Sequence, residues 1–141
     1  MKLHRSLAIT LFIVGIVSAS FVPQRNVDKG MLGKWYWINT AGSSTFMLSL
    51  ESSGDSLYGY YCSIVDKGNR IDCALGEYNI SGTGSARVAK VKFNSFFDAK
   101  NGTAILRLIG DTSLIWEITK VPTDGDCYAP KKVTLSRHKR W

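Results

Sequence analysis

Short segments of alternating polarity, separated by turn residues, constrain the fold of this chain more than any other feature of its sequence. In TFMLSLE, Phe46, Leu48 and Leu50 fall on one face of an extended chain, and Met47 and Ser49 fall on the other. The same period of two recurs in SLYGYYCSIV, ARVAKVKF, TAILRLI, SLIWEIT and KVTLSR. Because successive side chains of a strand point to opposite faces, this alternation predicts half-buried β-strands.

Clusters of Gly, Asn, Asp and Ser lie between these segments and predict turns. They read ESSGDS, DKGN, SGTGS, AKNGT, GDTS and PTDGD. No amphipathic stretch of helical length follows the first 19 residues, and a chain of 141 residues suits one domain with one core. About eight short antiparallel strands therefore predict an all-β fold, either a closed barrel or a sandwich.

The first 19 residues have the pattern of a cleaved signal peptide. Lys2 and Arg5 precede an apolar run from Leu7 to Val17, and small residues follow it. A leader of this kind is removed on export, so we expect a periplasmic or secreted protein without a transmembrane span in the mature chain. We expect residues 20–30 to form a flexible lead-in and residues 31–137 to form the β-barrel domain.

The net charge of +7 is concentrated at the two ends of the sequence. Residues 20–130 hold as many acidic as basic side chains, whereas five Lys or Arg residues and no acid follow them. A basic end can meet nucleic acid, anionic lipid, glycan or an acidic protein. We interpret residues 138–141 as a solvated basic tail and do not expect a nucleic acid partner.

The two cysteines in YYCSIVDKGNRIDC face each other if this segment forms a tight hairpin. With Lys67-Gly68 at its tip, or with a four-residue loop in the same register, Cys62 lies opposite Cys73. Directly opposed side chains need only a small adjustment to form a disulfide, and an exported protein meets an oxidising compartment. We therefore predict a Cys62–Cys73 disulfide, with Cys127 either free or an alternative partner of one of the two.

No set of catalytic or metal-binding residues stands out in the sequence. The mature chain has one His, close to the C-terminus, so neither a Ser-His-Asp triad nor a four-ligand zinc site can be assembled. Its acidic residues are scattered, mostly in predicted turns, and SGTGS lacks the ending of a phosphate-binding loop. We expect a protein that is not an enzyme and needs no metal or cofactor.

Four residues are candidates for contact with a partner protein. Phe96 and Phe97 lie near a predicted turn, where paired aromatic side chains suggest either a contact surface or a cap on one end of the fold. Arg70 lies beside the hairpin tip, and Ser81 belongs to the SGTGS segment. A binding protein that presents rigid loops would use residues of these kinds.

The segment GKWYWINTAGSSTFMLSL, with LYGYYCS after it, resembles the opening of the calycin group, which includes lipocalins, avidins and fatty-acid-binding proteins. Gly33 and Trp35 match the Gly-x-Trp of the first strand in that group. The resemblance implies a single antiparallel up-and-down β-barrel of about eight strands in a small exported bacterial protein. It also implies that an Arg from late in the chain packs on the Trp, a role that Arg137 could fill.

The same resemblance implies a set of residues that could hold a small ligand. By analogy with avidins, polar contacts would come from four residues, and aromatic side chains would line the cavity. These candidates are Asn39, Ser44, Tyr61 and Ser63, together with Trp35, Trp37 and Trp116.

Two functions follow as hypotheses. The chain is similar in size, signal peptide and lack of a catalytic constellation to periplasmic lysozyme inhibitors and immunity proteins. This similarity favours a non-catalytic barrel that binds a partner protein in the periplasm or outside the cell. The alternative is a calycin-like carrier of a small apolar or biotin-like ligand, which requires a cavity inside the barrel.

Overall fold

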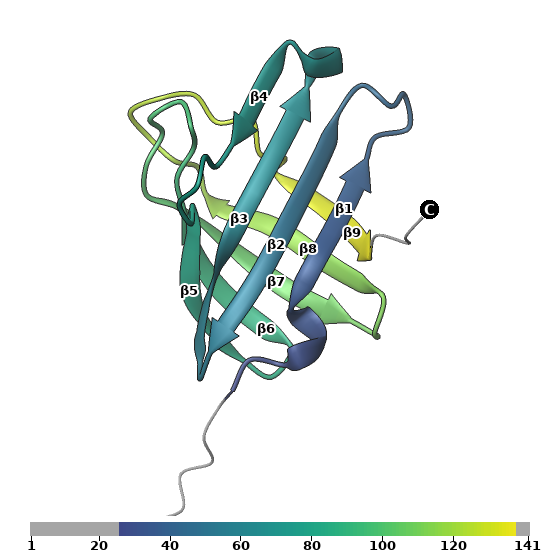
Figure 1. Ribbon diagram of the computed structural model, residues 1–141, viewed down its shortest axis with the longest axis vertical. Coiled ribbons are helices and arrows are strands. Elements are labelled where there is room, and N and C mark those ends of the chain that lie inside the picture. The colour runs from purple at the N-terminus through teal and green to yellow at the C-terminus, as the bar shows by residue number, and fades with distance from the viewer. Residues whose placement is uncertain (1–25, 138–141) are drawn as a thin grey trace, which may run out of the picture.

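A computed structural model describes residues 26–137, and these form an all-β domain (Figure 1). Two short 3₁₀ helices, η1 (Lys29–Met31) and η2 (Asp66–Gly68), accompany nine strands. The strands are β1 (Gly33–Ile38), β2 (Thr45–Ser53), β3 (Ser56–Val65), β4 (Arg70–Cys73), β5 (Ile80–Ser85), β6 (Val88–Phe93), β7 (Gly102–Ile109), β8 (Ser113–Lys120) and β9 (Lys132–Arg137).

Eight of the nine strands close into an antiparallel up-and-down barrel, as the sequence predicts. Around the barrel, β1, β2, β3, β5, β6, β7, β8 and β9 follow one another in sequence order, and β9 returns to pair with β1. The closing pair is short, because only Trp35 and Tyr36 of β1 are matched with residues of β9. The ninth strand, β4, is not part of the closed barrel. It pairs only with the C-terminal half of β3.

An arginine reinforces the short seam between β1 and β9. The guanidinium carbon of Arg137 lies 4.4 Å from the ring centroid of Trp35, and the guanidinium also donates to the carbonyls of Leu32 and Gly30. Such a cation over an indole ring is attracted by the negative face of the ring. The contact between a late Arg and the first-strand Trp is therefore present in this barrel.

The barrel interior holds the apolar face of each strand that the alternation predicts. Phe46, Leu48 and Leu50 of β2 are buried, and Ala89, Val91 and Phe93 of β6 are buried while the residues between them are exposed. Rings from different strands meet in the centre, where the centroid of Trp116 lies 5.2 Å from those of both Phe46 and Phe93. Aromatic side chains from several strands thus pack against one another in the centre of the barrel.

The hairpin between β3 and β4 has the predicted register. Cys62 is matched with Cys73 and forms the disulfide, and Ser63 is matched with Asp72. Four residues, 66–69, make the connection, and Asp66, Lys67 and Gly68 all have positive φ. Cys127, whose partner the sequence left open, is a free thiol.

One predicted turn is instead a strand of the barrel. SGTGS forms most of β5, and its register places Gly82 opposite Val91. A Cβ atom on Gly82 would lie 2.0 Å from the carbonyl oxygen of Lys90, so this glycine allows the two backbones to approach closely. Glycine in this segment therefore reflects close packing of strands and not a reversal of the chain.

The chain enters the barrel earlier than the sequence predicts. Val27, expected in the flexible lead-in, forms a bridge with Ala86 and is buried, and Met31 at the end of η1 is fully buried. The predicted signal peptide, the lead-in before residue 26 and the basic tail at 138–141 lie outside the described residues. Within residues 26–137, no helix has the length and apolar character needed to cross a bilayer.

Candidate functional site

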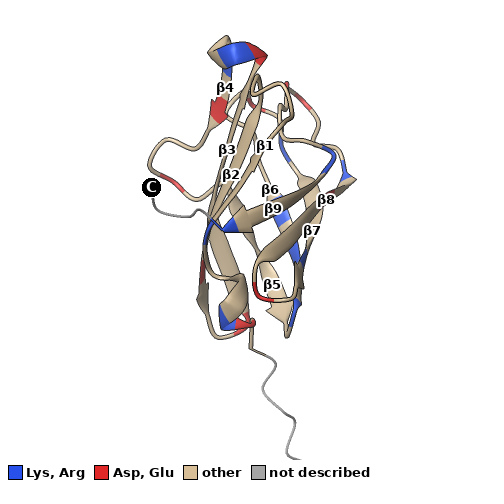
Figure 2. Ribbon diagram, turned by 90° about the vertical axis from the view of Figure 1, so that its right-hand side faces the viewer, with Lys and Arg blue, Asp and Glu red and all other residues tan. Residues whose placement is uncertain are grey.

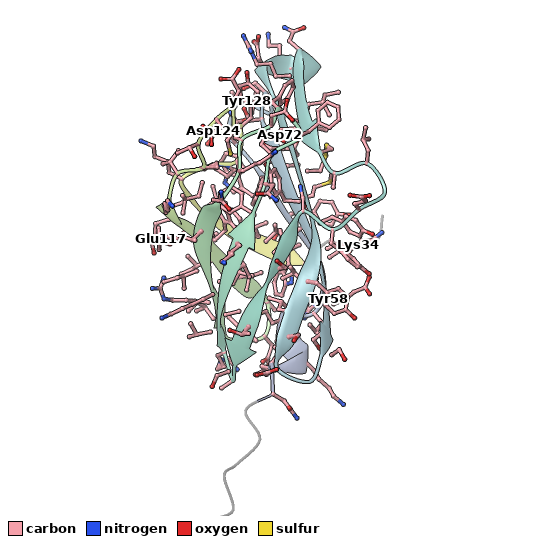
Figure 3. The ribbon with its side chains drawn as sticks, turned by 90° about the vertical axis from the view of Figure 1, so that its left-hand side faces the viewer. Lys34, Tyr58, Asp72, Glu117, Asp124 and Tyr128 are labelled. Carbon is pink, nitrogen blue, oxygen red and sulfur yellow. A yellow bond between two sulfur atoms is a disulfide. The ribbon has the colours of Figure 1, made fainter. Side chains whose placement is uncertain are left out.

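A buried aspartate lies at the end of the barrel where β1, β3, β6 and β8 finish (Figure 3). Asp72 of β4 is fully buried, and both of its carboxylate oxygens accept hydrogen bonds. Oδ2 accepts from the Tyr61 hydroxyl at 2.9 Å and from the Tyr128 amide at 3.0 Å. Oδ1 accepts from the Phe96 amide at 2.8 Å and lies 3.1 Å from the Ser95 hydroxyl oxygen. Hydrogen bonds of this number compensate a carboxylate for the loss of water.

These bonds tie three separate segments to one another. Asp72 itself lies on β4, Phe96 belongs to the 94–101 loop, and Tyr128 belongs to the 121–131 segment. A further bond runs from the Ser63 hydroxyl to the Tyr128 carbonyl at 2.6 Å. The disulfide at the end of β4 holds this strand to β3, so the carboxylate is fixed relative to the barrel.

The two long segments also pair directly with each other. The amide of Lys100 donates to the Thr123 carbonyl at 2.8 Å, and the amide of Thr123 donates back at 3.0 Å. The amide of Asp126 donates to the Phe97 carbonyl at 3.2 Å. Both segments therefore have backbone hydrogen-bond partners, and such partners favour an ordered segment.

An aromatic rim stands on this support, and we define it as Arg70, Phe96, Phe97 and Tyr128. The ring of Phe97 packs edge-on against Phe96 at 5.5 Å and against Tyr128 at 5.3 Å between centroids. The guanidinium carbon of Arg70 lies 5.2 Å from the Tyr128 centroid, and Arg70 donates to the Tyr128 hydroxyl at 2.5 Å. The four side chains thus form one continuous row of contacts across β4 and the two segments beside it.

Three side chains of the aromatic rim are exposed and Tyr128 is half-buried, and further apolar side chains lie next to the rim. Phe96 is 52% exposed and Phe97 is 37% exposed, although both are large and apolar. Ile71 on β4 is 51% exposed, and Leu75, two residues after the end of β4, is 74% exposed. A surface hollow lies beside Phe96, and its lining includes Leu75, Tyr78, Asn79, Asn94 and Ser95.

The buried groups around Asp72 are held in their neutral forms. Burial raises the pKa of the Tyr61 hydroxyl, and the charge of Asp72 raises it further. Burial also raises the pKa of the Cys127 thiol, which lies near the same two side chains. A protonated thiol is a poor nucleophile, so this cluster is suited to holding structure in place. Residues 26–137 contain no group of three or more His, Cys, Asp or Glu side chains placed to hold a metal ion.

The structure separates the predicted ligand-binding residues into three groups. The aromatic ones lie in the core: Trp35, Tyr61 and Trp116 are fully buried, and Trp37 is partly buried. Asn39 and Ser44 lie in the connection between β1 and β2, where the Asn39 side chain accepts from the Ser44 amide at 3.1 Å. Ser63 is bonded to the 121–131 segment, as described above.

Of the predicted partner-binding residues, three come together and one does not. Arg70, Phe96 and Phe97 meet in the aromatic rim. Ser81 lies on the outer face of β5, where it lines a different hollow. Sequence reasoning overlooked Asp72 and Tyr128. The predicted hairpin register already placed Asp72 opposite Ser63, but the distant segment that supplies Tyr128 left no signal of its position.

Comparison with known proteins gives no relative for this chain: no family model, curated protein or solved structure matches it. Conclusions about function therefore depend on the geometry of this fold.

Proposed function

We propose that this protein is an exported, non-catalytic β-barrel that binds a partner protein through its aromatic rim, in the manner of an inhibitor or immunity protein. The observation that carries the proposal is a row of aromatic side chains, two of them exposed, beside a buried carboxylate that accepts from the backbone of the row. Phe96 and Tyr128 each donate their backbone amide to Asp72. Phe96 and Phe97 are exposed, and Tyr128 is half-buried.

The chemistry of the aromatic rim supports a protein partner. Aromatic residues and Arg are enriched at the centres of protein interfaces, where they contribute most of the binding free energy. A folded chain gains nothing from leaving Phe96 and Phe97 in water, so their exposure favours a contact surface. Because the segments are ordered before binding, association loses little conformational entropy.

The packed interior supports binding at the rim in preference to binding inside the barrel. Trp35, Tyr61 and Trp116 are fully buried, and Tyr61 and Trp116 are in ring contact with each other or with Phe46 and Phe93. A small-ligand carrier would have to displace these side chains, which costs dispersion and hydrophobic energy. We therefore rank the carrier function second.

Two further features belong to this proposal. We infer export from the signal-like N-terminus, and the Cys62–Cys73 disulfide is in accord with an oxidising compartment. We infer a calycin-like barrel from the Gly-x-Trp segment, and the position of Arg137 over Trp35 supports it.

Site-specific photo-crosslinking tests the proposed function. A photoreactive phenylalanine analogue is placed at Phe96 of the full chain in the producing cell, and adducts are identified by mass spectrometry. The control position is Ile109, which is as exposed as Phe96. It is the last residue of β7, whereas the 94–101 loop with Phe96 and Phe97 precedes the first residue of that strand, so Ile109 lies at the opposite end of the barrel. We expect one protein adduct from position 96 and none from 109.

The partner identified in this way then allows a quantitative measurement. Phe96→Ala with Phe97→Ala is expected to weaken its binding by at least a hundredfold in calorimetry, at a temperature where thermal unfolding shows that the variant is still fully folded. Equal crosslinking from positions 96 and 109, or undiminished binding by the double variant, would overturn the proposal.

A further inference from the structure

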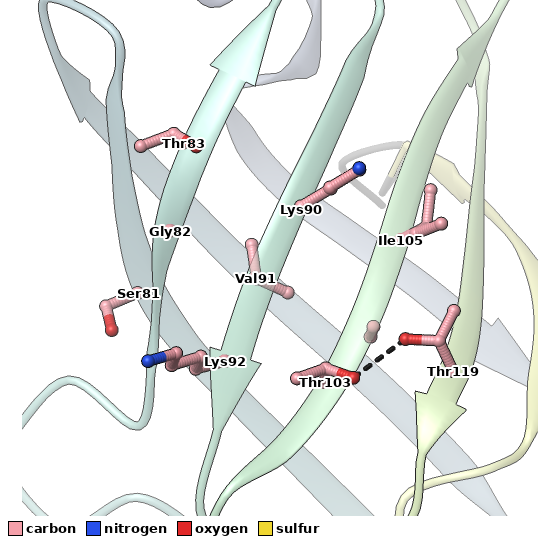
Figure 4. A pocket seen from close by; sticks show the side chains of 10 residues that line it. Ser81, Gly82, Thr83, Lys90, Val91, Lys92, Thr103, Ile105 and Thr119 are labelled. Carbon is pink, nitrogen blue, oxygen red and sulfur yellow. Dashed lines mark hydrogen bonds between the residues drawn. The ribbon is translucent and has the colours of Figure 1, made fainter.

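A second surface, away from the aromatic rim, has the composition of a ligand site. It is a shallow hollow of about 570 Å³ on the outer face of β5, β6, β7 and β8 (Figure 4). We call it the lysine hollow and define it by six side chains that line it. These are Ser81, Thr83, Lys90, Lys92, Thr103 and Thr119.

The strand register arranges these side chains in two parallel rows across the sheet. In one row, Lys92 is matched with Ser81 on β5 and with Thr103 on β7. The Thr103 hydroxyl in turn lies 2.8 Å from that of Thr119 on β8, and a hydrogen bond joins them. Neighbouring strands are about 4.8 Å apart, so this row sets one ammonium and three hydroxyl groups along a line across four strands.

The second row lies two residues away along each strand. Lys90 is matched with Thr83 on one side and with Ile105 on the other. The Cα atoms of Lys90 and Lys92 are therefore about 7 Å apart along β6. Both side chains lie on the outer face of the strand. Val91, Ala104 and Ile105 also line the hollow and give it an apolar floor between its polar groups.

Neither Lys90 nor Lys92 forms an ion pair within residues 26–137. Two acids lie near the hollow. Asp55 lines an adjacent hollow with Lys90 and Thr83 but forms no ion pair with Lys90. Glu117, matched with Ile105, is bonded to Arg107 at 2.9 Å and lies 3.6 Å from Lys132. These two bases hold the pKa of Glu117 below its usual range, so its charge is already paired with cations. Figure 2 shows further Lys and Arg positions on the strands of this side.

We propose that the lysine hollow binds an acidic saccharide, meaning a sugar chain that carries carboxylate, sulfate or phosphate groups. Two unpaired ammonium groups complement anionic substituents as point charges. The hydroxyls of Ser81, Thr83, Thr103 and Thr119 can donate to and accept from sugar hydroxyls, while the apolar floor suits the carbon face of a sugar ring. This mixture of a few charges with many hydroxyls favours a saccharide over a lipid surface or a nucleic acid, which would call for denser basic side chains.

A heparin dodecasaccharide serves as the acidic probe, and a neutral dextran of similar length serves as its control. The full mature chain is used with Lys139→Gln and Arg140→Gln, so that charges after residue 137 do not contribute. Titration calorimetry at 50 mM salt is expected to detect heparin binding and no dextran binding. Raising the salt to 200 mM should weaken heparin binding several-fold, because ion pairs are screened.

Paired variants separate a defined site from diffuse attraction. Lys90→Gln with Lys92→Gln is expected to weaken heparin binding at least tenfold. Lys29→Gln with Lys34→Gln removes the same charge from exposed positions elsewhere and should change it less than twofold. Thr119→Val alters no charge and is expected to weaken binding about threefold through the lost hydroxyl.

Four outcomes would overturn the proposal. They are no heparin binding at 50 mM salt, equal losses in the two charge variants, undiminished binding after Thr119→Val, or tighter binding of a 12-base-pair DNA or of vesicles with anionic phospholipid than of heparin. The aromatic rim is untouched by all of these variants, so failure here leaves the proposed protein partner unaffected.

Discussion

The hydroxyl of Tyr61 donates a hydrogen bond to Oδ2 of Asp72 over 2.9 Å, and this bond joins the barrel interior to the end that carries the aromatic rim. Tyr61 contacts Phe46 and Phe93 in the core, whereas Asp72 fixes the backbone amides of Phe96 and Tyr128. The order of the proposed contact surface therefore depends on Asp72, a buried residue that a partner would not contact.

Replacing this carboxylate should loosen the aromatic rim before it unfolds the barrel. In Asp72→Asn an amide NH₂ replaces one acceptor oxygen and faces donors, so we expect about 2–4 kcal/mol less stability to urea. Hydrogen exchange should quicken at the amides of Phe96 and Tyr128 more than at Val91 in β6. Asp55→Asn, an exposed control, should change stability by less than about 0.5 kcal/mol. Unchanged exchange at positions 96 and 128 would contradict this role of Asp72.

Alkaline pH should destabilise the protein through Tyr61. Its pKa in the folded state is raised above the ordinary value of 10.0, mainly by burial. Once the pH exceeds the pKa of the unfolded chain, the folded state binds more protons than the unfolded state, so the free energy of unfolding falls as pH rises. Urea titrations between pH 8 and 11 should give a steeper fall for the wild type than for Tyr61→Phe. A residual slope is expected in the variant from Tyr78, whose pKa is also raised. Parallel pH profiles would show that Tyr61 ionises freely in the folded protein.

Removal of the disulfide should lower stability by a moderate amount. The Cys62–Cys73 bridge spans 11 residues, and closing so short a loop restricts the unfolded chain by about 2–3 kcal/mol. The Cys62→Ser, Cys73→Ser variant is expected to lose that amount in chemical unfolding, and dithiothreitol should have the same effect on the wild type. Cys127→Ala provides the control, since it leaves the bridge intact, and its stability should still fall when dithiothreitol is added. If dithiothreitol did not lower the stability of Cys127→Ala, the disulfide would have to include Cys127 instead of joining Cys62 to Cys73.

Arg137 should contribute more to stability than an ordinary surface arginine. Arg137→Gln removes the cation over Trp35 and leaves two backbone carbonyls without their donor, so a loss of about 1–2 kcal/mol is expected. Arg137→Lys should recover only part of it, because a single ammonium cannot match the planar guanidinium. Arg107→Gln is the matched control, and loss of its exposed ion pair should cost less than about 1 kcal/mol. Similar losses from the two Gln variants would mean that the seam between β1 and β9 does not depend on this contact.

A methyl group at Gly82 tests whether SGTGS is a barrel strand. Gly82→Ala would place Cβ 2.0 Å from the carbonyl of Lys90, and the required backbone shift should cost more than about 2 kcal/mol. Gly54→Ala is the comparison, because Gly54 has φ of +63° and open space around it, and should cost about 1 kcal/mol. Thermal unfolding of both proteins measures the difference. Equal losses of stability in Gly82→Ala and Gly54→Ala would favour a turn at SGTGS, as its glycine content suggested.

Much of the candidate site could be placed in the sequence but not assembled from it. Hairpin register fixed the pairing of Cys62 with Cys73, because side chains across an antiparallel pair are matched one to one. The same register put Asp72 opposite Ser63, although nothing local revealed that its carboxylate would be buried. Phe96 and Arg70 were recognisable as contact candidates, yet Tyr128, which joins them through Phe97, lies far away in sequence.

The fold class, the inward face of most strands and the disulfide could be predicted from the sequence, because each depends on a period of two within a few residues. Three features became visible only in the folded chain: SGTGS pairs as β5, β4 stands outside the closed barrel, and the 121–131 segment docks on Asp72. These features arise from contacts between segments far apart in the chain. Hydrophobic alternation specifies which side of a strand is buried. Which distant side chains come into contact depends on how the barrel closes and on how closely neighbouring strands approach each other.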